Sequence, residues 1–403
     1  MKILAMTAGT RGDVEPFVAL ATAATAAGHQ VSLAVTEEFA DETAVEGVAI
    51  ETIAGNFRAV IEAQGISGWA AAKAFRTTVA PMMARLLTSS AAIAMRTRPD
   101  VIVHHPKILS AELAAAALGI PAVVAEAVPV LTPTNEFPAP GIASGSLGPL
   151  NRLSYRAVAA APLMFKQPLA ELRAELGLPL TGRLPAPQLD LVTVSPALLP
   201  RPHDWPLSTQ LTGQWLDPDA SAGGPADDEL DAFLEGGNVL YAGFGSMALG
   251  DPVARREAVL QAARQLGLRT LLVTGWGGLD ASDLTPSPDV LVRASVPHRS
   301  VFPRCALAVH HGGAGTVHGV VRAGLPSVVV PFFADQPFWG DLLHRRGLAG
   351  PSVPASRLTA VRLAASLAAA PSAAAVELLG AAIRAEDGCR TALELLGTLG
   401  SAD

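Results

Sequence analysis

The stretch Val309-His310-His311-Gly312-Gly313-Ala314-Gly315-Thr316 decides how the chain folds. A short apolar run enters a glycine-rich turn, and a helix follows over Val317–Ala323 until Gly324 ends it. Small residues let the backbone approach a ligand closely, and free N–H groups at the start of a helix favour an anion. The stretch therefore predicts a strand–turn–helix unit that can hold a diphosphate, with His311 as a further donor. A glycine-rich turn with satisfied histidines is an equally weighted alternative.

The same alternation of strand and helix runs through both halves of the chain and predicts parallel sheets covered by helices. The expected strands are Ile3–Met6, Gln30–Val35, Val101–Val103, Ala122–Ala125, Leu189–Val194, Asn238–Ala242, Thr270–Val273, Val290–Arg293, Leu307–Val309 and Ser327–Val330. We expect an α/β protein of two doubly wound, Rossmann-like domains facing a cleft, with ligands beyond the carboxyl ends of the strands. The predicted domains are residues 1–215 and 229–403, joined by a linker at 216–228 that is rich in Asp, Pro, Gly and Ser. The last helix could pack back on the first domain.

The composition excludes several classes of protein. Half of the 403 residues are apolar and the mean hydropathy is +0.36, so intrinsic disorder is excluded. The richest apolar runs, Leu113–Leu131 and Leu363–Ile383, are interrupted by proline and glutamate. We therefore expect a cytoplasmic protein without a signal peptide or stable membrane insertion. The net charge is −7, and the sequence contains no basic stripe. Both observations argue against nucleic acid as a partner.

Three further turns after predicted strands carry polar residues. Ser246 ends the turn Phe244-Gly245-Ser246, where its hydroxyl could donate to a phosphate or cap the next helix. Asp335 and Gln336 combine a carboxylate with an amide, which suits the hydroxyls of a sugar, although a helix cap is the simpler explanation. Asp13 stands between the first strand and the first helix, where it is ionised at neutral pH and could be a general base or a helix cap.

Motifs of several other enzyme classes are missing from the sequence. It contains no G-x-G-x-x-G, Walker, H-E-x-x-H or G-x-S-x-G pattern. Asp217-Pro218-Asp219 has the spacing of a metal–sugar-nucleotide motif but falls in the predicted linker. His104-His105 follows a predicted strand and could line the cleft, but one such pair is weak evidence for a metal. The sequence therefore predicts neither a metal nor a tightly bound cofactor.

Together these motifs resemble a two-domain, inverting, nucleotide-sugar-dependent glycosyltransferase of the GT-B fold. The family is the one that holds glycopeptide-antibiotic, macrolide, sterol and glucuronosyl transferases. Gly9–Pro16 resembles its acceptor-side motif, and Val296–Gln336 resembles its donor-binding signature. Tyr241–Ser246 with Asp251-Pro252, and Thr132–Pro138, are similar to the sterol glucosyltransferase branch. The resemblance covers nearly the whole chain.

The resemblance implies a role for each matching position. Asp13 would be the catalytic base, Val296 and His298 would face the nucleobase, and Asp335 and Gln336 would bind the donor sugar. The residues implied to bind the donor diphosphate are Ser246, His311, Gly313, Gly315 and Thr316. The reaction would invert the anomeric carbon and need no metal.

Two positions depart from the plant-type signature of this family. Val296 stands where that signature has a tryptophan on the uracil, and Gly319 stands where it has a glutamate on the ribose. The preference for uridine over thymidine is therefore open. UDP-glucose is the favoured donor, and a dTDP-sugar is the alternative.

We expect the acceptor to be an apolar polycyclic or macrocyclic natural product, bound by Gly55–Leu87 and Val128–Leu150. The expected acceptor contacts are Trp69, Phe75, Met82 and Phe137. About half of the large apolar residues in these segments could instead be core. A GT-B nucleotide-sugar epimerase and a catalytically silent binding partner are the alternatives, and a monomer or a homodimer is expected.

Overall fold

The computed structural model describes residues 1–399 apart from 57–74, 217–226, 246, 248, 276 and 286. The chain forms two compact units. The first contains Met1–Thr134, Arg152–Pro218 and Asp387–Asp403, and the second contains Asn135–Asn151 and Asp219–Glu386. Each unit is built on one parallel sheet with helices, which confirms the predicted α/β fold class.

The first unit has a seven-stranded sheet in the order β3-β2-β1-β4-β5-β6-β7, and each neighbouring pair is parallel. Its strands are β1 (Lys2–Met6), β2 (Gln30–Thr36), β3 (Ala49–Ile53), β4 (Val101–His104), β5 (Ala122–Glu126), β6 (Leu189–Val192) and β7 (Thr209–Leu211). Its helices include α1 (Arg11–Ala26), α2 (Glu37–Ala40), α5 (Ala80–Thr97), α6 (Ala111–Leu118), α7 (Asn151–Ala159), α8 (Lys166–Glu175) and α16 (Gly388–Leu399). The strand order reverses between β1 and β4, which favours a ligand site beyond the carboxyl ends of these two strands.

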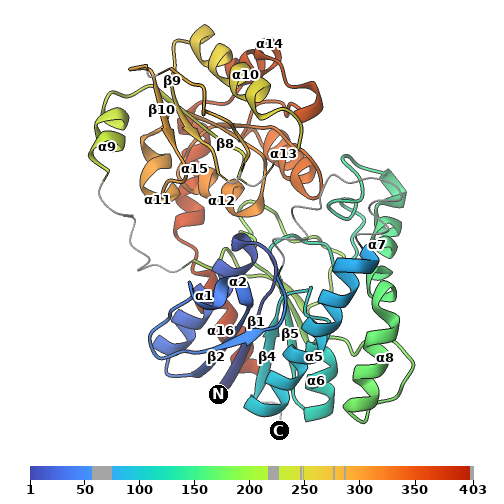
Figure 1. Cartoon of the computed structure of the whole chain (residues 1–403). Helices are drawn as coiled ribbons and strands as arrows, with labels where there is room; N and C mark the ends of the chain where they lie inside the picture. Colours follow the sequence, from blue (N-terminus) through green and yellow to red (C-terminus); the bar gives the residue numbers. More distant parts are fainter. Residues whose placement is uncertain are drawn as a thin grey trace. The chain divides into compact units, whose positions relative to one another are not determined.

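Alternate side chains of β1 point to opposite faces of the first sheet, and both faces are buried. Ile3 and Ala5 join the core under α1 and α16, where Cys389 is also buried. Leu4 and Met6 join the core under α5 and α6. Figure 1 shows the C-terminal helix α16 beside α1, so the end of the chain completes the unit that the beginning of the chain starts.

The second unit has a five-stranded parallel sheet in the order β10-β9-β8-β11-β12. Its strands are β8 (Val239–Gly243), β9 (Arg269–Val273), β10 (Val290–Arg293), β11 (Leu307–His310) and β12 (Ser327–Val329). Its helices include α9 (Asp228–Glu235), α10 (Pro252–Gln265), α11 (His298–Val301), α12 (Ala314–Arg322), α13 (Gln336–Arg345), α14 (Ala360–Ala368) and α15 (Ala373–Arg384). Here the order reverses between β8 and β11, which makes their carboxyl ends the second expected site.

The structure divides the chain differently from the predicted domain boundaries at one segment. Asn135–Asn151 belongs to the second unit, although it was expected in the domain of residues 1–215. The Phe137 ring packs against the Phe338 ring of α13, with their centroids 5.2 Å apart. A side chain at Gly141 would meet the backbone of Ala334 at 3.5 Å. These contacts attach the segment to the loop and helix that follow β12.

One helix in the described part of the chain is long and apolar enough to cross a membrane. It joins the π-helical turn Phe75–Val79 to α5 and spans 23 residues, Phe75–Thr97, with a mean hydropathy of 1.2. Ala360–Ala368 and Ala373–Leu399 pass the same test only as a pair, bent by 74°. Met82 and Leu86 of α5 are buried against the first sheet, and a buried core helix also meets such a criterion. The absence of membrane insertion therefore stays a prediction.

Candidate active site

The first site lies where β1 and β4 end side by side, with Met6 paired to His104. The chain leaves β1 through a short turn and begins α1 with Thr10 as the N-cap. Asp13 is the third helical residue, and its Oδ2 accepts hydrogen bonds from the Thr10 N–H at 2.6 Å and the Thr10 hydroxyl at 3.0 Å. The helix cap is thus Thr10, and Asp13 closes a capping box that fixes its carboxylate at the sheet edge.

Two basic side chains from the loop after β4 converge on the same carboxylate. His105 Nε2 lies 3.2 Å from Asp13 Oδ1, and Lys107 Nζ donates to Asp13 Oδ2 at 2.9 Å. His105 Nδ1 accepts from the Lys107 N–H at 3.2 Å, which leaves the Nε2–H of the neutral ring to donate to Asp13. Gly9, with φ of +138°, makes room for this cluster, because a β-carbon there would lie 2.2 Å from Asp13 Oδ2.

The cluster holds Asp13 as an anion. Burial alone would raise the pKa of Asp13. The charge of Lys107, that of His105 once it is protonated, and the hydrogen bonds of both outweigh burial and hold this pKa well below its usual range. Burial lowers the pKa of His105, Lys107 lowers it further, and Asp13 opposes both. At neutral pH the site therefore contains a carboxylate whose negative charge is oriented by a neutral imidazole and an ammonium group.

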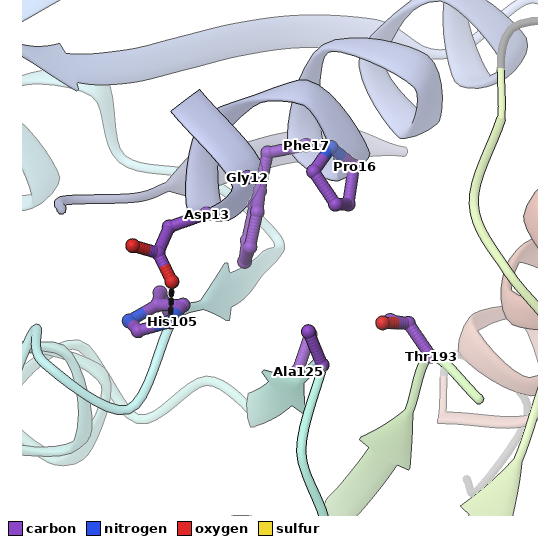
Figure 2. A pocket seen from close by; sticks show the side chains of 8 residues that line it. Gly12, Asp13, Pro16, Phe17, His105, Ala125 and Thr193 are labelled. Carbon is purple, nitrogen blue, oxygen red and sulfur yellow. Dashed lines mark ion pairs between the residues drawn. The ribbon is translucent and has the colours of Figure 1, made fainter. Parts of the chain in front are cut away.

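Asp13 lines a small hollow (Figure 2). Its other lining residues, from α1 and from the ends of β4, β5 and β6, are Gly12, Pro16, Phe17, His105, Ala125, Ala127 and Thr193. The polar groups at this hollow are the Asp13 carboxylate, the His105 imidazole and the Thr193 hydroxyl, and the remaining lining is apolar or glycine.

The second site lies where β8 and β11 end side by side, with Gly243 paired to His310. His311 follows β11, and two glycines pack against its ring. A β-carbon at Gly245 would lie 3.3 Å from His311 Cε1, and one at Gly313 would lie 2.6 Å from His311 Nε2. Burial lowers the pKa of His311 to about 4, with a further lowering by His298. His311 is therefore a neutral hydrogen-bonding group at pH 7.

Helix α12 begins directly after this turn, with Gly313 as its N-cap. A β-carbon at Gly315 would meet nothing within 4 Å, so the first turn of the helix is open. The free N–H groups and the positive end of the helix dipole are thus accessible beside His311. This geometry fits an anionic group such as a diphosphate, as the sequence predicts.

The turn after β12 presents Asp335 and Gln336 differently. Asp335 is half-buried, and its Oδ2 accepts a hydrogen bond from the Trp339 indole at 2.8 Å. Gln336 is buried: its Oε1 accepts from the Phe332 N–H at 2.7 Å, and its Nε2 donates to Met247 Sδ at 3.2 Å. The Asp335 carboxylate is thus held by Trp339 in a half-buried position, whereas the Gln336 side chain shapes the turn.

The predicted nucleobase residues lie at the end of β10. His298 is half-buried, stacks on Phe302 with a centroid distance of 4.3 Å, and bonds the Tyr241 hydroxyl through Nε2 at 2.9 Å. Val296 is half-buried in the preceding loop. A β-carbon at Gly319 would lie 3.1 Å from the Phe302 ring. A side chain at this position would therefore press against the Phe302 ring.

Comparisons with known proteins agree with this geometry. Residues 3–141 match the glycosyltransferase family 28 N-terminal domain, and residues 278–390 match the erythromycin biosynthesis protein CIII-like C-terminal domain. The chain is 32% identical to O-mycaminosyltylonolide 6-deoxyallosyltransferase of Streptomyces fradiae, over 98% of this chain and 97% of that protein. The chain belongs to the family 1 glycosyltransferases of the GT-B fold.

The chain is also similar to a curated plant protein and to solved structures of two glycosyltransferases. It is 33% identical to sterol 3-beta-glucosyltransferase UGT80A2 of Arabidopsis thaliana over 87% of this chain, and the match spans 58% of the length of that relative. The solved glycosyltransferase of kitacinnamycin has a TM-score of 0.78 at 21% identity, covering 99% of this chain and 98% of its own. Glycosyltransferase VinC, solved in complex with dTDP, has a TM-score of 0.68 at 20% identity, covering 99% of this chain and all of its own. Both structural likenesses show the fold.

The described residues among those predicted to contact the acceptor belong to two different units. Met82 is buried in the core between α5 and the first sheet, and Phe137 is buried against Phe338 in the second unit. Phe75 is half-buried and packs against Phe165, with the ring centroids 5.9 Å apart. Trp69 and the predicted phosphate ligand Ser246 lie outside the described residues. Large apolar residues look alike in a sequence whether they fill a core or line a ligand site, so the acceptor contacts of Met82 and Phe137 stay predictions.

The sequence also missed part of this glycosyltransferase's first site. His105 was expected to line the cleft or, as weak evidence only, to bind a metal, but no contact with Asp13 was predicted, and Lys107 was not singled out. Their contact with Asp13 depends on the pairing of β1 with β4, about which local motifs say nothing. Within the described ranges, no three or more His, Cys, Asp and Glu side chains are grouped as metal ligands. Independence of a metal remains a prediction.

A pair of buried acids in the first unit makes the free energy of unfolding depend on pH. Glu126 on β5 and Asp190 on β6 are both buried, and Asp190 accepts from the Thr132 hydroxyl at 2.7 Å. Burial raises the pKa of Asp190 to about 6, and burial together with Asp190 raises the pKa of Glu126 well above its usual range. A raised carboxyl pKa stabilises the fold below the unfolded value near 4, and this stabilisation is lost as pH rises through about 6.

Asp190→Asn should therefore stabilise the protein at pH 8 relative to wild type by roughly 1–3 kcal/mol and by much less at pH 4. Urea unfolding at both pH values measures the difference. An equal effect at the two pH values would contradict the assigned cause.

Proposed function

We propose that this glycosyltransferase moves a hexose from a nucleoside diphosphate sugar to a hydroxyl of an apolar polycyclic or macrocyclic natural product, with inversion and without a metal. The observation that carries the proposal is the Asp13 carboxylate, fixed by Thr10, His105 and Lys107 beside a largely apolar hollow. Membership of the family supports the reaction class.

The acceptor hydroxyl would enter the hollow and donate its hydrogen bond to Asp13. As the hydroxyl oxygen attacks the anomeric carbon, its proton passes to the carboxylate, and the bond from that carbon to the diphosphate oxygen breaks with its electron pair. His105 cannot replace Asp13 as base in this geometry, because one ring nitrogen accepts from the Lys107 N–H and the other donates to Asp13. The depressed pKa of Asp13 keeps the base ionised over the whole working pH range, so its protonation should not set the acid limb of the rate profile.

The leaving diphosphate would bind at the open start of α12. Backbone N–H groups around Gly315, the helix dipole and the neutral His311 would carry its developing charge in place of a metal. Asp335 offers its carboxylate to the hydroxyls of the donor sugar.

Nucleoside diphosphate sugars of uridine and of thymidine are both candidate donors. The plant relative is named a glucosyltransferase, and the structurally similar VinC was solved with dTDP. UDP-glucose is the first candidate and a dTDP-hexose the second. With glycine at position 319, the chain lacks the carboxylate that the plant-type signature places on the ribose, so that contact does not favour uridine here.

A donor and acceptor panel read by mass spectrometry tests the proposal. Purified protein with UDP-glucose or dTDP-glucose and hydroxylated steroids, macrolides and polyketides should give a glycoside of inverted configuration, with equal yield in the presence of EDTA. Conversion of the donor sugar without an acceptor would indicate an epimerase instead. Binding of the nucleotide without turnover on any acceptor would indicate a silent binding protein.

A further inference from the structure

Arg255 is a buried cation beside the donor site that the sequence did not single out. It stands in the first turn of α10 with 6% of its surface exposed. Its Nη1 donates to the Met247 carbonyl at 3.2 Å and also to the Gly278 carbonyl, and its Nη2 donates to the Leu249 carbonyl. The guanidinium is therefore held by backbone oxygens from the loops after β8 and β9.

The same guanidinium reaches a third loop through aromatic rings. Its central carbon lies 5.6 Å from the Phe244 ring centroid, after β8, and 4.7 Å from that of Phe332, after β12. Gln336 links the loop after β8 to the loop after β12, because its Nε2 donates to Met247 Sδ while its Oε1 accepts from the Phe332 N–H. Arg255 thus sits at the centre of a network that joins three loops at the carboxyl edge of the second sheet.

The charge of Arg255 is not neutralised at close range. No carboxylate of the described residues lies within 4.0 Å of it, and the Asp251 carboxylate caps the N–H groups of Val253 and Ala254 instead. A cation in the first turn of a helix also faces the unfavourable end of the dipole. Arg256, the next residue, is equally buried but pairs with Asp283 and Glu257. The two neighbours therefore differ in charge compensation and not in burial.

We propose that Arg255 is a positioning residue for the nucleotide sugar. It fixes the loops that carry Gly245, beside His311, and the turn that carries Asp335, and its uncompensated charge favours a diphosphate at this edge of the sheet. The inference rests on the proposed donor site. It goes beyond that site by assigning a residue that need not touch the ligand.

Calorimetric titration with UDP, dTDP and uridine tests the role in Arg255→Met, Arg255→Lys and the matched control Arg256→Met. Arg255→Met should raise the Kd of the nucleoside diphosphate at least about tenfold, leave the Kd of uridine unchanged and lower kcat/KM about a hundredfold. Arg255→Lys should regain much of the diphosphate affinity, because the charge remains, but little of kcat/KM, because the planar fork is lost. Arg256→Met should lower the melting temperature and leave all three Kd values as in wild type.

Each other outcome has a definite meaning. Wild-type diphosphate affinity in folded Arg255→Met would overturn the inference and leave the proposed function standing. If Arg255→Met does not fold, wild-type kcat/KM in Arg255→Lys would overturn it in the same way. Failure of the wild-type protein to bind either nucleoside diphosphate would overturn the proposed function, and this inference with it.

Discussion

Asp13→Asn should lower kcat for glycosyl transfer by about 10²–10⁴-fold, the usual contribution of a general base. The amide has the shape of the carboxylate but cannot take the proton of the acceptor hydroxyl. The Kd of the nucleoside diphosphate should not change, because Asp13 belongs to the first unit and the proposed diphosphate site to the second. Initial rates with saturating donor and acceptor, together with calorimetric titration of the diphosphate, measure the two quantities.

The structure supplies a matched control and a second variant for this prediction. Asp100 also accepts a backbone hydrogen bond, from the Lys2 N–H at 2.7 Å, but it stands at the amino end of β4, the opposite edge of the sheet from Asp13. Asp100→Asn should keep wild-type kcat. His105→Gln retains a donor toward Asp13 and should cost less than Asp13→Asn, since His105 orients the base. If Asp13→Asn kept more than a tenth of wild-type kcat, the base would have to be another group.

Gly315→Asp should weaken binding of the nucleoside diphosphate by about a hundredfold without unfolding the protein. A side chain at Gly315 meets nothing within 4 Å, so the fold has room for it. The new carboxylate would stand at the open start of α12, where it repels an anion and competes for the same N–H groups. Titration of UDP and dTDP gives the affinity, and thermal unfolding gives the stability.

Gly315→Ala separates the effect of charge from that of volume. Alanine is a better helix former than glycine by up to about 1 kcal/mol, so this variant should be at least as stable as wild type. It should bind the diphosphate more weakly than wild type but more tightly than Gly315→Asp. Unchanged affinity in the aspartate variant would mean that the diphosphate lies elsewhere.

The strand–turn–helix unit around the second site could be predicted because its signals are local. The apolar run before the turn became β11, and Gly324 follows the C-cap of α12 as expected. The helix begins at Ala314 and not at Val317, so Gly315 and Thr316 lie in its first turn. Asp13 was found for the same reason, since in the sequence it stands between a predicted strand and a predicted helix. The family resemblance added the roles of these positions, which spacing alone left open.

Other parts of the sites depend on contacts between distant segments. Lys107 is 94 residues from Asp13 and meets it only through the pairing of β1 with β4. In the sequence Arg255 is one of several charged residues on an expected helix, and nothing there reveals that it is buried without a close carboxylate. Gln336 was assigned to the sugar by resemblance, whereas the structure shows both ends of its amide engaged within the protein.

The attachment of Asn135–Asn151 to the second unit matters for anyone who recombines halves of related enzymes. A chimera joined at the linker near residues 216–228 would take this segment from one parent and α13 from the other. The Phe137–Phe338 packing and the approach of Gly141 to Ala334 would then join surfaces that were not selected together. A three-part exchange, in which residues 135–151 travel with residues 227–386, keeps both contacts within one parent.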